Sequence, residues 1–149
     1  NALGRRTEDT DVRIEQVDKR NRKVETAKEE EDWSPREYGN PDSDNLVISW
    51  GSNEGAMREA LDYLDDEDID VRFLSVPYIF PRPDLSDDIE AADEAIVVEC
   101  NESGQFADLL EHDALTRVKR VNKYNGVRFK ADELAEEIEA ALQSEEVEA

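Results

Sequence analysis

Two polar, glycine-bearing turns hold the side chains of this sequence that could do chemistry. One is Gly51–Gly55, with the sequence Gly-Ser-Asn-Glu-Gly, and the other is Cys100–Gly104, with the sequence Cys-Asn-Glu-Ser-Gly. Each follows an apolar run typical of a strand and precedes a helix, whose free backbone N–H groups could hold an anion. In open α/β sheets, ligands and partners meet the carboxyl ends of the strands. Function is therefore expected at these two turns.

Phosphate binding at the turns is disfavoured by the residues within them. Neither turn has the glycine spacing of a dinucleotide fingerprint or the lysine of a P-loop. Each also carries a carboxylate, Glu54 or Glu102, where an incoming phosphate would sit. The alternative role of the first turn is structural: Ser52 or Asn53 caps the following helix, and Gly55 permits close packing.

The second turn offers hydrogen-bonding groups without a nucleophile. Glu99 stands at a strand end beside Asn101 and Gln105, a set that suits an interface or a ligand contact better than covalent chemistry. No Ser, Cys or Lys here has a plausible base partner, so no catalytic residue is predicted within this chain. The interface or ligand candidates are Gly51, Ser52, Gly55, Glu99, Asn101, Gly104 and Gln105.

A metal site is not predicted either. The acidic stretch 65–70 alternates oxygen ligands but lacks the central glycine and the distal glutamate of a calcium loop. Cys100 is the single cysteine, which excludes a disulfide framework and a cysteine-ligated cluster within this chain. His112, the single histidine, lies in a polar stretch and is expected at the surface.

The charge of the chain is strongly negative. The net charge is −22, charged residues make up 39% of the chain, and only six residues are lysine. Nucleic acid is excluded as a partner because phosphates would be repelled. Such a surface suits a salt-loaded cytoplasm, because screening shortens to about 3 Å at about 1 M salt. A halophilic source is therefore predicted, with a multivalent-cation site as the alternative. The apolar runs are too short for a membrane span, and no signal peptide is visible.

Residues 1–44 are predicted to be an N-terminal helical and linker extension. Apolar residues at helical spacing predict a helix over 11–28 with a narrow stripe, which suggests packing against another domain or subunit. The basic cluster 19–23 is a solvated helix face or, alternatively, a site for an anionic partner. The linker that follows holds Pro35 and Pro41 and ends before the first strand.

From residue 45 to 149 the pattern alternates between strand and helix. The predicted strands are 46–50, 71–76, 95–99 and 118–121, and the predicted helices are 53–64, 84–92, 103–111 and 132–143. The strand runs are continuously apolar, as expected when helices cover both faces of a sheet. The fold class is therefore α/β: a three-layer α/β/α sandwich with a mainly parallel sheet.

The same turns carry a family resemblance. Gly51, Ser52 and Gly55 match a Gly-Ser-x-x-Gly turn, and the segment 99–105 matches a Glu-x-Asn-x-x-Gly-Gln pattern, the most specific of the matches. With these motifs the chain resembles the C-terminal portion of the α subunit of 2-oxoacid:ferredoxin oxidoreductases, whose fold is similar to the C-terminal domain of transketolases. Further matches are Glu59, Ala60, Phe80-Pro81-x-Pro83, Tyr124–Gly126 and the basic cluster 19–23.

One position departs from the family pattern. Lys130-Ala131 stands where a capping Ser or Thr followed by Pro is expected before the last helix. Transketolase-type carbohydrate chemistry is disfavoured by the third-strand motif, because a glycine pair usually replaces it in transketolases.

The resemblance implies part of an archaeal, cytoplasmic enzyme that converts a 2-oxoacid to its acyl-coenzyme A thioester and passes electrons to ferredoxin. Thiamine diphosphate with Mg²⁺, and an iron–sulfur cluster, are expected in the full complex. This chain lacks a Gly-Asp-Gly segment and the cysteines for a cluster, so the fragment is expected to bind none of these cofactors. It is predicted to be a non-catalytic assembly and interface domain, packed on the preceding α-subunit domain (of which Asn1–Gly4 is the tail) and on the β subunit. The alternative is a free-standing small-ligand or coenzyme A binding module.

Overall fold

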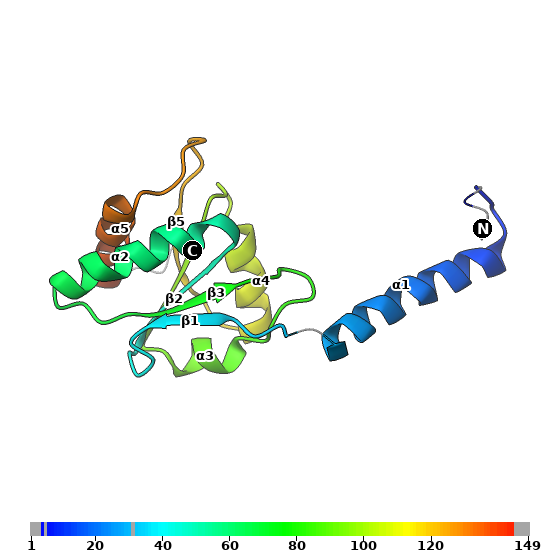
Figure 1. Cartoon of the computed structure of the whole chain (residues 1–149), viewed down its shortest axis with the longest axis horizontal. Helices are drawn as coiled ribbons and strands as arrows, with labels where there is room; N and C mark the ends of the chain where they lie inside the picture. Colours follow the sequence, from blue (N-terminus) through cyan, green and yellow to red (C-terminus); the bar gives the residue numbers. More distant parts are fainter. Residues whose placement is uncertain (1–3, 5, 31, 145–149) are drawn as a thin grey trace. The chain divides into compact units, whose positions relative to one another are not determined.

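The computed structural model describes residue 4, residues 6–30 and residues 32–144. The chain divides into two compact units, Asn1–Trp33 and Ser34–Ala149 (Figure 1). The segment 34–44, predicted to be part of the N-terminal extension, thus groups with the second unit.

The first unit is built on helix α1 (Thr10–Glu30), which confirms the helix predicted over 11–28. The Asp9 carboxylate begins it by accepting hydrogen bonds from the backbone N–H groups of Asp11 and Val12, each at 3.0 Å. Every residue of α1 is at least partly exposed, and Ile14 is 59% exposed. Local capping and propensity, rather than a buried face, therefore define this helix.

The second unit contains one five-stranded sheet in the order β1-β3-β2-β4-β5. The strands are β1 (Arg36–Gly39), β2 (Asn45–Trp50), β3 (Arg72–Val76), β4 (Glu94–Glu99) and β5 (Lys119–Asn122). β1 runs antiparallel to β3, and the other neighbouring pairs are parallel. The predicted mainly parallel sheet is confirmed.

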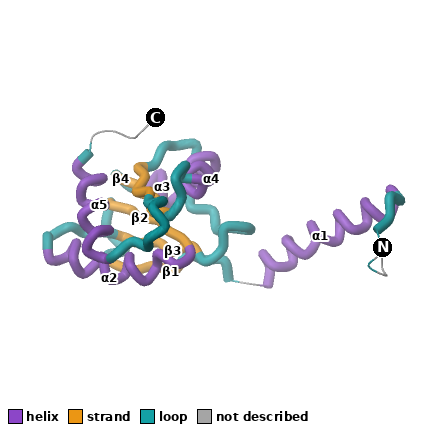
Figure 2. The backbone as a smooth tube through the Cα atoms, turned by 90° about the horizontal axis from the view of Figure 1, so that it is seen from above, coloured by secondary structure: helices purple, strands orange, loops and turns teal. Residues whose placement is uncertain are grey.

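Helices cover both faces of this sheet (Figure 2). They are the 3-10 turn η1 (Gly51–Asn53), α2 (Glu54–Asp66), α3 (Ser86–Ala91), α4 (Gln105–Ala114) and α5 (Ala131–Gln143). The four strands and four helices predicted for this unit are confirmed, with small differences at their ends. No helix in the described part of the chain is long and apolar enough to cross a membrane.

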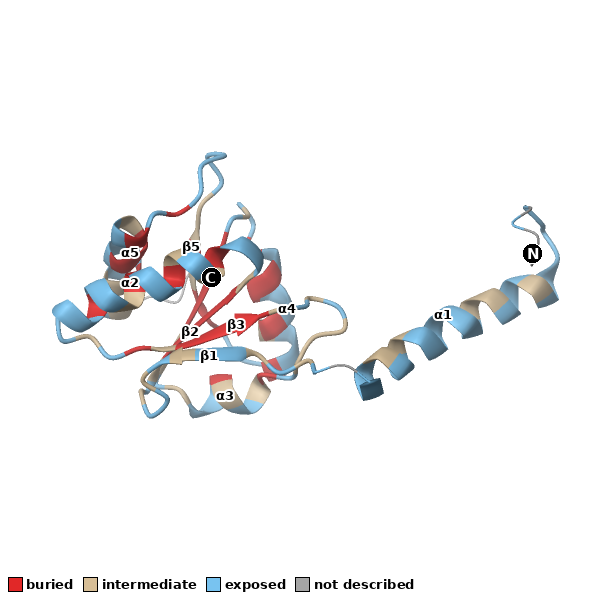
Figure 3. Ribbon diagram, viewed as in Figure 1, coloured by how far each residue is buried: buried red, intermediate tan, exposed pale blue. Residues whose placement is uncertain are grey.

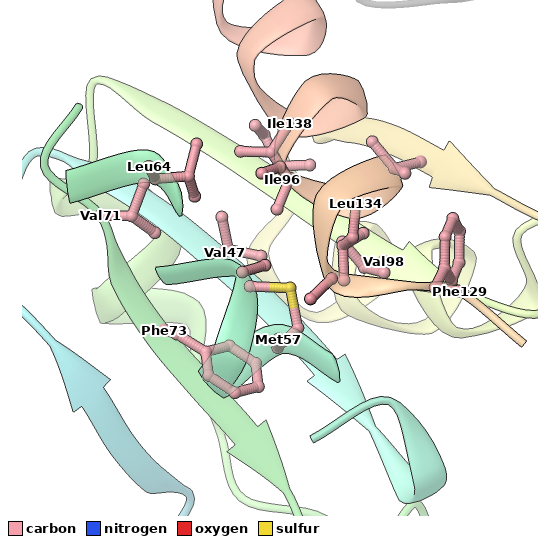
Figure 4. Close-up of a cluster of buried hydrophobic side chains, with 14 residues drawn as sticks. Val47, Met57, Leu64, Val71, Phe73, Ile96, Val98, Phe129, Leu134 and Ile138 are labelled. Atoms are coloured by element: carbon pink, nitrogen blue, oxygen red, sulfur yellow. The ribbon is translucent and has the colours of Figure 1, made fainter. Parts of the chain in front are cut away.

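The core consists of two apolar layers, one on each side of the sheet (Figure 3). On one side, Val47, Phe73 and Ile96 of the strands pack against α2 and α5 (Figure 4). On the other side, Leu46 and Val97 pack with residues of α3 and α4. Successive residues of a strand face opposite layers, so residues on both faces of these strands must be apolar. The three-layer α/β/α sandwich is thereby confirmed.

The prediction of a linker up to residue 44 is wrong for 36–39, which form the edge strand β1. Tyr38 stacks on Phe73 with ring centroids 5.7 Å apart, while Arg36 and Glu37 are exposed. An edge strand is covered on one side only and is often charged. The apolar alternation that reveals the inner strands is therefore missing here.

Candidate functional site

Both predicted turns lie at the carboxyl edge of the sheet, after neighbouring strands. β2 and β4 pair in parallel, with Ser49 opposite Val98, so the turns that follow them emerge side by side. The Cys100 thiol donates a hydrogen bond to Asn53 Oδ1 over 3.4 Å, which links the two turns. The structure thus brings together the two turns selected from the sequence.

The second turn is closed by the carboxylate of Glu99, the residue that precedes it, and not by Glu102, which is exposed. Glu99 is fully buried, and its Oε1 accepts hydrogen bonds from the backbone N–H groups of Phe106, at 3.0 Å, and Ala107, at 3.1 Å. Asn101 Nδ2 donates to Glu99 Oε2 over 2.7 Å. A buried carboxylate at the positive end of α4 satisfies the helix N–H groups and is itself stabilised. The N-terminus of α4 is therefore occupied from within.

Gly104 has two structural reasons to be glycine. Its φ is +67°, and an added Cβ would lie 2.8 Å from Arg120 Nη1 and 3.2 Å from Asn122 Nδ2. Arg120 Nη1 also donates to the Ser103 carbonyl over 3.3 Å. β5 side chains therefore hold the turn in place. Within the motif, the buried side chain of Glu99 and the glycine serve the fold, whereas Gln105 is exposed.

The first turn is arranged differently, because Glu54 points away from it. Its Oε1 accepts a hydrogen bond from the Tyr38 hydroxyl at 2.8 Å, and its Oε2 accepts from Ser75 Oγ at 2.9 Å and from Arg36 Nη1 at 3.0 Å. The hydrogen bond from Tyr38 is the main cause that lowers the pKa of the Glu54 carboxyl, and it raises the pKa of the Tyr38 phenol. Glu54 thus ties the edge strand to α2.

The predicted capping of α2 by Ser52 or Asn53 is wrong. The described residues provide α2 with no side-chain cap hydrogen bond, and Asn53 has helical backbone angles (φ −76°, ψ −17°). An N-cap residue needs an extended backbone, and η1 instead leads straight into the helix. Close packing at Gly55 is also wrong, since apart from its chain neighbours and its own helix backbone no described atom lies within 4 Å of the position of an added Cβ.

A hollow of about 480 Å³ opens beside the first turn. Its walls come from the start of α2 and from the segment that leads into α5. The lining residues are Ser52, Asn53, Gly55, Ala56, Glu59, Tyr63, Arg128, Phe129, Lys130, Ala131 and Asp132. Sequence reasoning selected Ser52 and Gly55 but missed the segment 128–132, which is far away along the chain. The one feature of the sequence that singled out this segment was Lys130, which stands where the family pattern has a capping Ser or Thr.

Replacing Tyr38 by phenylalanine should make stability less dependent on acid pH. An unfolded glutamate has a pKa of about 4.3, and the pKa of Glu54 in the folded protein is lower. The Tyr38–Glu54 contact therefore stabilises the fold at pH values above about 4.3. This stabilisation is lost as the pH falls through the folded pKa of Glu54. Urea unfolding of both proteins between about pH 3 and pH 7 should show a deficit of the variant at neutral pH that disappears in acid. Tyr63→Phe, on the exposed side of α2, serves as the control and should follow the wild type; a deficit that persists in acid would contradict this role.

Comparison with known proteins finds relatives that are similar to this chain. The 2-oxoacid:ferredoxin oxidoreductase subunit alpha of Saccharolobus solfataricus is 31% identical over 144 residues, which cover 93% of this chain and 23% of that protein. This chain is similar to one segment of such an α subunit. The chain spans less than a quarter (23%) of the length of that relative. No family model matches the chain.

Two solved structures share the fold. The 2-oxoglutarate:ferredoxin oxidoreductase from Magnetococcus marinus, solved with 2-oxoglutarate, coenzyme A and succinyl-CoA bound, gives a TM-score of 0.74 at 20% identity over 94% of this chain and 25% of that chain. A transketolase mutant from Pichia stipitis gives 0.54 at 14% identity over 79% of this chain and 18% of that chain. These likenesses confirm the transketolase C-terminal-like fold.

Proposed function

We propose that this chain is the C-terminal assembly domain of the α subunit of a 2-oxoacid:ferredoxin oxidoreductase. The observation that carries the proposal is a similarity that covers 93% of this chain but only 23% of the relative. The full enzyme would decarboxylate a 2-oxoacid oxidatively and form its acyl-coenzyme A thioester, with ferredoxin as electron acceptor. Thiamine diphosphate, Mg²⁺ and an iron–sulfur cluster would be bound by other parts of the complex.

The carboxyl edge of the sheet is the proposed docking surface for the preceding α-subunit domain and the β subunit. Beside the candidates Gly51, Ser52, Gly55, Glu99, Asn101, Gly104 and Gln105, large apolar side chains are exposed in the loops after β3 and β5. They are Tyr78 (46% exposed), Phe80 (75%), Tyr124 (68%) and Val127 (60%). Exposed apolar side chains near polar ones are typical of protein interfaces. Glu99 and Gly104 would support this edge rather than contact the partner.

A cytoplasm rich in salt is proposed as the working environment. The second unit carries thirty Asp and Glu against ten Lys and Arg. At low salt these carboxylates repel one another and oppose the compact state, and concentrated cations screen the repulsion. This supports a halophilic, and on the resemblance archaeal, source.

Association with the β subunit tests the proposed function. In about 2 M KCl, where screening is strong, the 149-residue chain is expected to form a complex with the β subunit of the same organism, measured by light scattering after gel filtration. Calorimetry of the chain alone with thiamine diphosphate should show no binding. Replacing both Phe80 and Tyr124 by serine should weaken the complex about tenfold or more.

The matched control is Leu115→Ser, because Leu115 is 88% exposed at the C-terminal end of α4. That helix returns from the carboxyl edge, so Leu115 lies away from the docking surface. Tight thiamine diphosphate binding by the chain alone, or equal weakening by the control, would refute the assembly role.

The alternative, a small-ligand or coenzyme A binding module, is supported by the hollow beside the first turn.

A further inference from the structure

The segment between β5 and α5 ends in an exposed tip. Residues 123–130 lie outside any helix or strand, and Figure 1 shows them as a loop that projects from the second unit. Lys123 fixes the base of this loop, because its Nζ donates to the Arg128 carbonyl over 3.2 Å and pairs with Glu133. The tip, residues 124–127, is exposed at every position. The loop therefore combines an anchored base with a tip open to solvent.

The tip contains the single Asn-Gly pair of the sequence, Asn125-Gly126. Asparagine is a thermolabile residue, because the backbone nitrogen of the next residue can attack the carbon of its side-chain amide. The attack meets least hindrance when the next residue is glycine, which has no Cβ beside that nitrogen. Each of the other asparagines is followed by a residue with a side chain.

The attacking nitrogen at this pair is unengaged. No described residue accepts a hydrogen bond from the Gly126 N–H. The contrast is Asn122, at the end of β5, because the N–H of Lys123 after it donates to the Glu99 carbonyl at 3.1 Å. A backbone N–H held in a sheet neither loses its proton readily nor moves toward a side chain. Reaction is therefore expected at Asn125 and not at Asn122.

The amide that is attacked is also held in place. Asn125 Oδ1 accepts a hydrogen bond from the Val127 N–H at 3.0 Å, an arrangement that folds an asparagine side chain back over the following peptide. This hydrogen bond draws electron density toward Oδ1 and makes Cγ of Asn125 more electrophilic. The tip thus brings an activated amide carbon next to an unengaged backbone nitrogen.

We propose that Asn125 deamidates spontaneously and that assembly of the enzyme protects it. Hydroxide removes the proton from the Gly126 nitrogen, which then forms a bond to Cγ of Asn125. The bond between Cγ and Nδ2 breaks, and Nδ2 takes a proton from water and leaves as ammonia, which restores the hydroxide. Water then opens the cyclic imide. Cleavage between Cγ and the nitrogen gives aspartate, and cleavage between the main-chain carbonyl carbon and the nitrogen gives isoaspartate.

The two products change the tip to different degrees. Both add a carboxylate between Tyr124, 68% exposed, and Val127, 60% exposed. Aspartate can still accept from the Val127 N–H, whereas isoaspartate lengthens the main chain by a methylene carbon and displaces Tyr124 from Val127. The protection rests on the proposed function, in which both side chains belong to the docking surface. A docked partner restricts the movement that the attack requires, so unassembled chains are modified first.

Peptide masses test the modification. Trypsin separates the two asparagines, because it cleaves after Arg120, Lys123 and Arg128. The 149-residue chain is incubated alone in KCl at mildly alkaline pH and digested at intervals. The peptide 124–128 should gain about 1 Da and divide into aspartyl and isoaspartyl forms, while the peptide 121–123 stays unchanged.

A synthetic peptide with the sequence of 124–128 gives the reference rate. The folded chain is expected to react within about tenfold of this rate, because an exposed loop tip is locally free to move. A rate more than about a hundredfold below the reference, or an equal mass gain in the peptide 121–123, would overturn the proposal. The rate should also rise with pH, since hydroxide removes the proton.

Three variants test the chemistry. Gly126→Ala should slow the reaction about tenfold or more, because its Cβ hinders the attacking nitrogen. Asn125→Gln should stop it, because the imide ring would be larger and forms far more slowly. Asn122→Gln is the matched control and should leave the rate at Asn125 unchanged. A wild-type rate in Gly126→Ala would refute attack by the backbone nitrogen.

The same incubation with the chain bound to the β subunit tests the protection. Deamidation in the complex should be about tenfold slower or more, because docking suppresses local opening. Gel filtration of an aged chain mixed with the β subunit should leave isoaspartyl chains enriched in the unbound fraction. Equal rates in the bound and the unbound chain would refute the protection. If no complex forms, the proposed function fails, while the incubation of the chain alone still decides whether Asn125 reacts.

Discussion

Replacing Glu99 by alanine is expected to lower the free energy of unfolding by about 4 kcal/mol, because hydrogen bonds to a charged acceptor contribute about 1.5–3 kcal/mol each. The variant would leave the buried N–H groups of Phe106 and Ala107 without their acceptor. It would also remove the partner of the Asn101 amide. Urea unfolding at constant KCl measures the change, since urea is uncharged and leaves screening unaltered.

Two further substitutions identify the cause of that loss. Glu99→Gln keeps one acceptor oxygen of similar shape and should lose about half as much stability. Glu102→Ala removes an exposed carboxylate from the same turn and should change stability by less than about 0.5 kcal/mol. Should the Glu102 and Glu99 variants lose similar amounts, the buried cap would not be the reason for the motif.

Gly39→Ala is expected to destabilise the second unit by about 2–3 kcal/mol, from left-handed backbone strain of about 1–2 kcal/mol and a clash. The φ of Gly39 is +77°, and an added Cβ would overlap the backbone carbonyl oxygen of Val71. Asn40, the next residue, donates its N–H to the same oxygen at 3.0 Å. The edge strand would have to move away from α2 and β3. Urea unfolding again measures the loss.

Gly126→Ala is the matched control. Its φ is +80°, and apart from its chain neighbours no described atom lies within 4 Å of its added Cβ. The free energy of unfolding should therefore fall by only about 1 kcal/mol, from the left-handed backbone strain alone. Equal losses at both glycines would show that the contact with Val71 is unimportant and that β1 tolerates displacement.

The edge strand shows where periodicity fails as a signal. The inner strands are covered on both faces, so their runs are apolar and their positions could be predicted. In β1 the contact with the core is made through Tyr38, which stacks on Phe73, and the other residues are exposed. One apolar residue between Pro35 and Gly39 is indistinguishable from a linker.

Part of the candidate site could likewise be predicted from the sequence and part could not. The segment 99–105 could be selected because its residues are close in sequence, but its pattern could not show that Glu99 turns inward to the α4 backbone. The hollow beside the first turn was not predictable, because Ser52 and Arg128 come to line it only through the packing of α2 against α5. Long-range packing of this kind leaves no periodic pattern in the sequence.

The sequence by itself determined the order of strands and helices, the covered parallel sheet and the resemblance to 2-oxoacid:ferredoxin oxidoreductase α subunits, because hydrophobic spacing and local motifs act over a few residues. Only the tertiary structure decided which helix end is closed and which is open. Glu54 lies within the first glycine-bearing turn and Glu99 directly before the second, and either carboxylate could have capped the helix that follows. The edge strand offers Glu54 the partners Tyr38 and Arg36, whereas Glu99, at the end of an inner strand, is buried beside the N–H groups of α4.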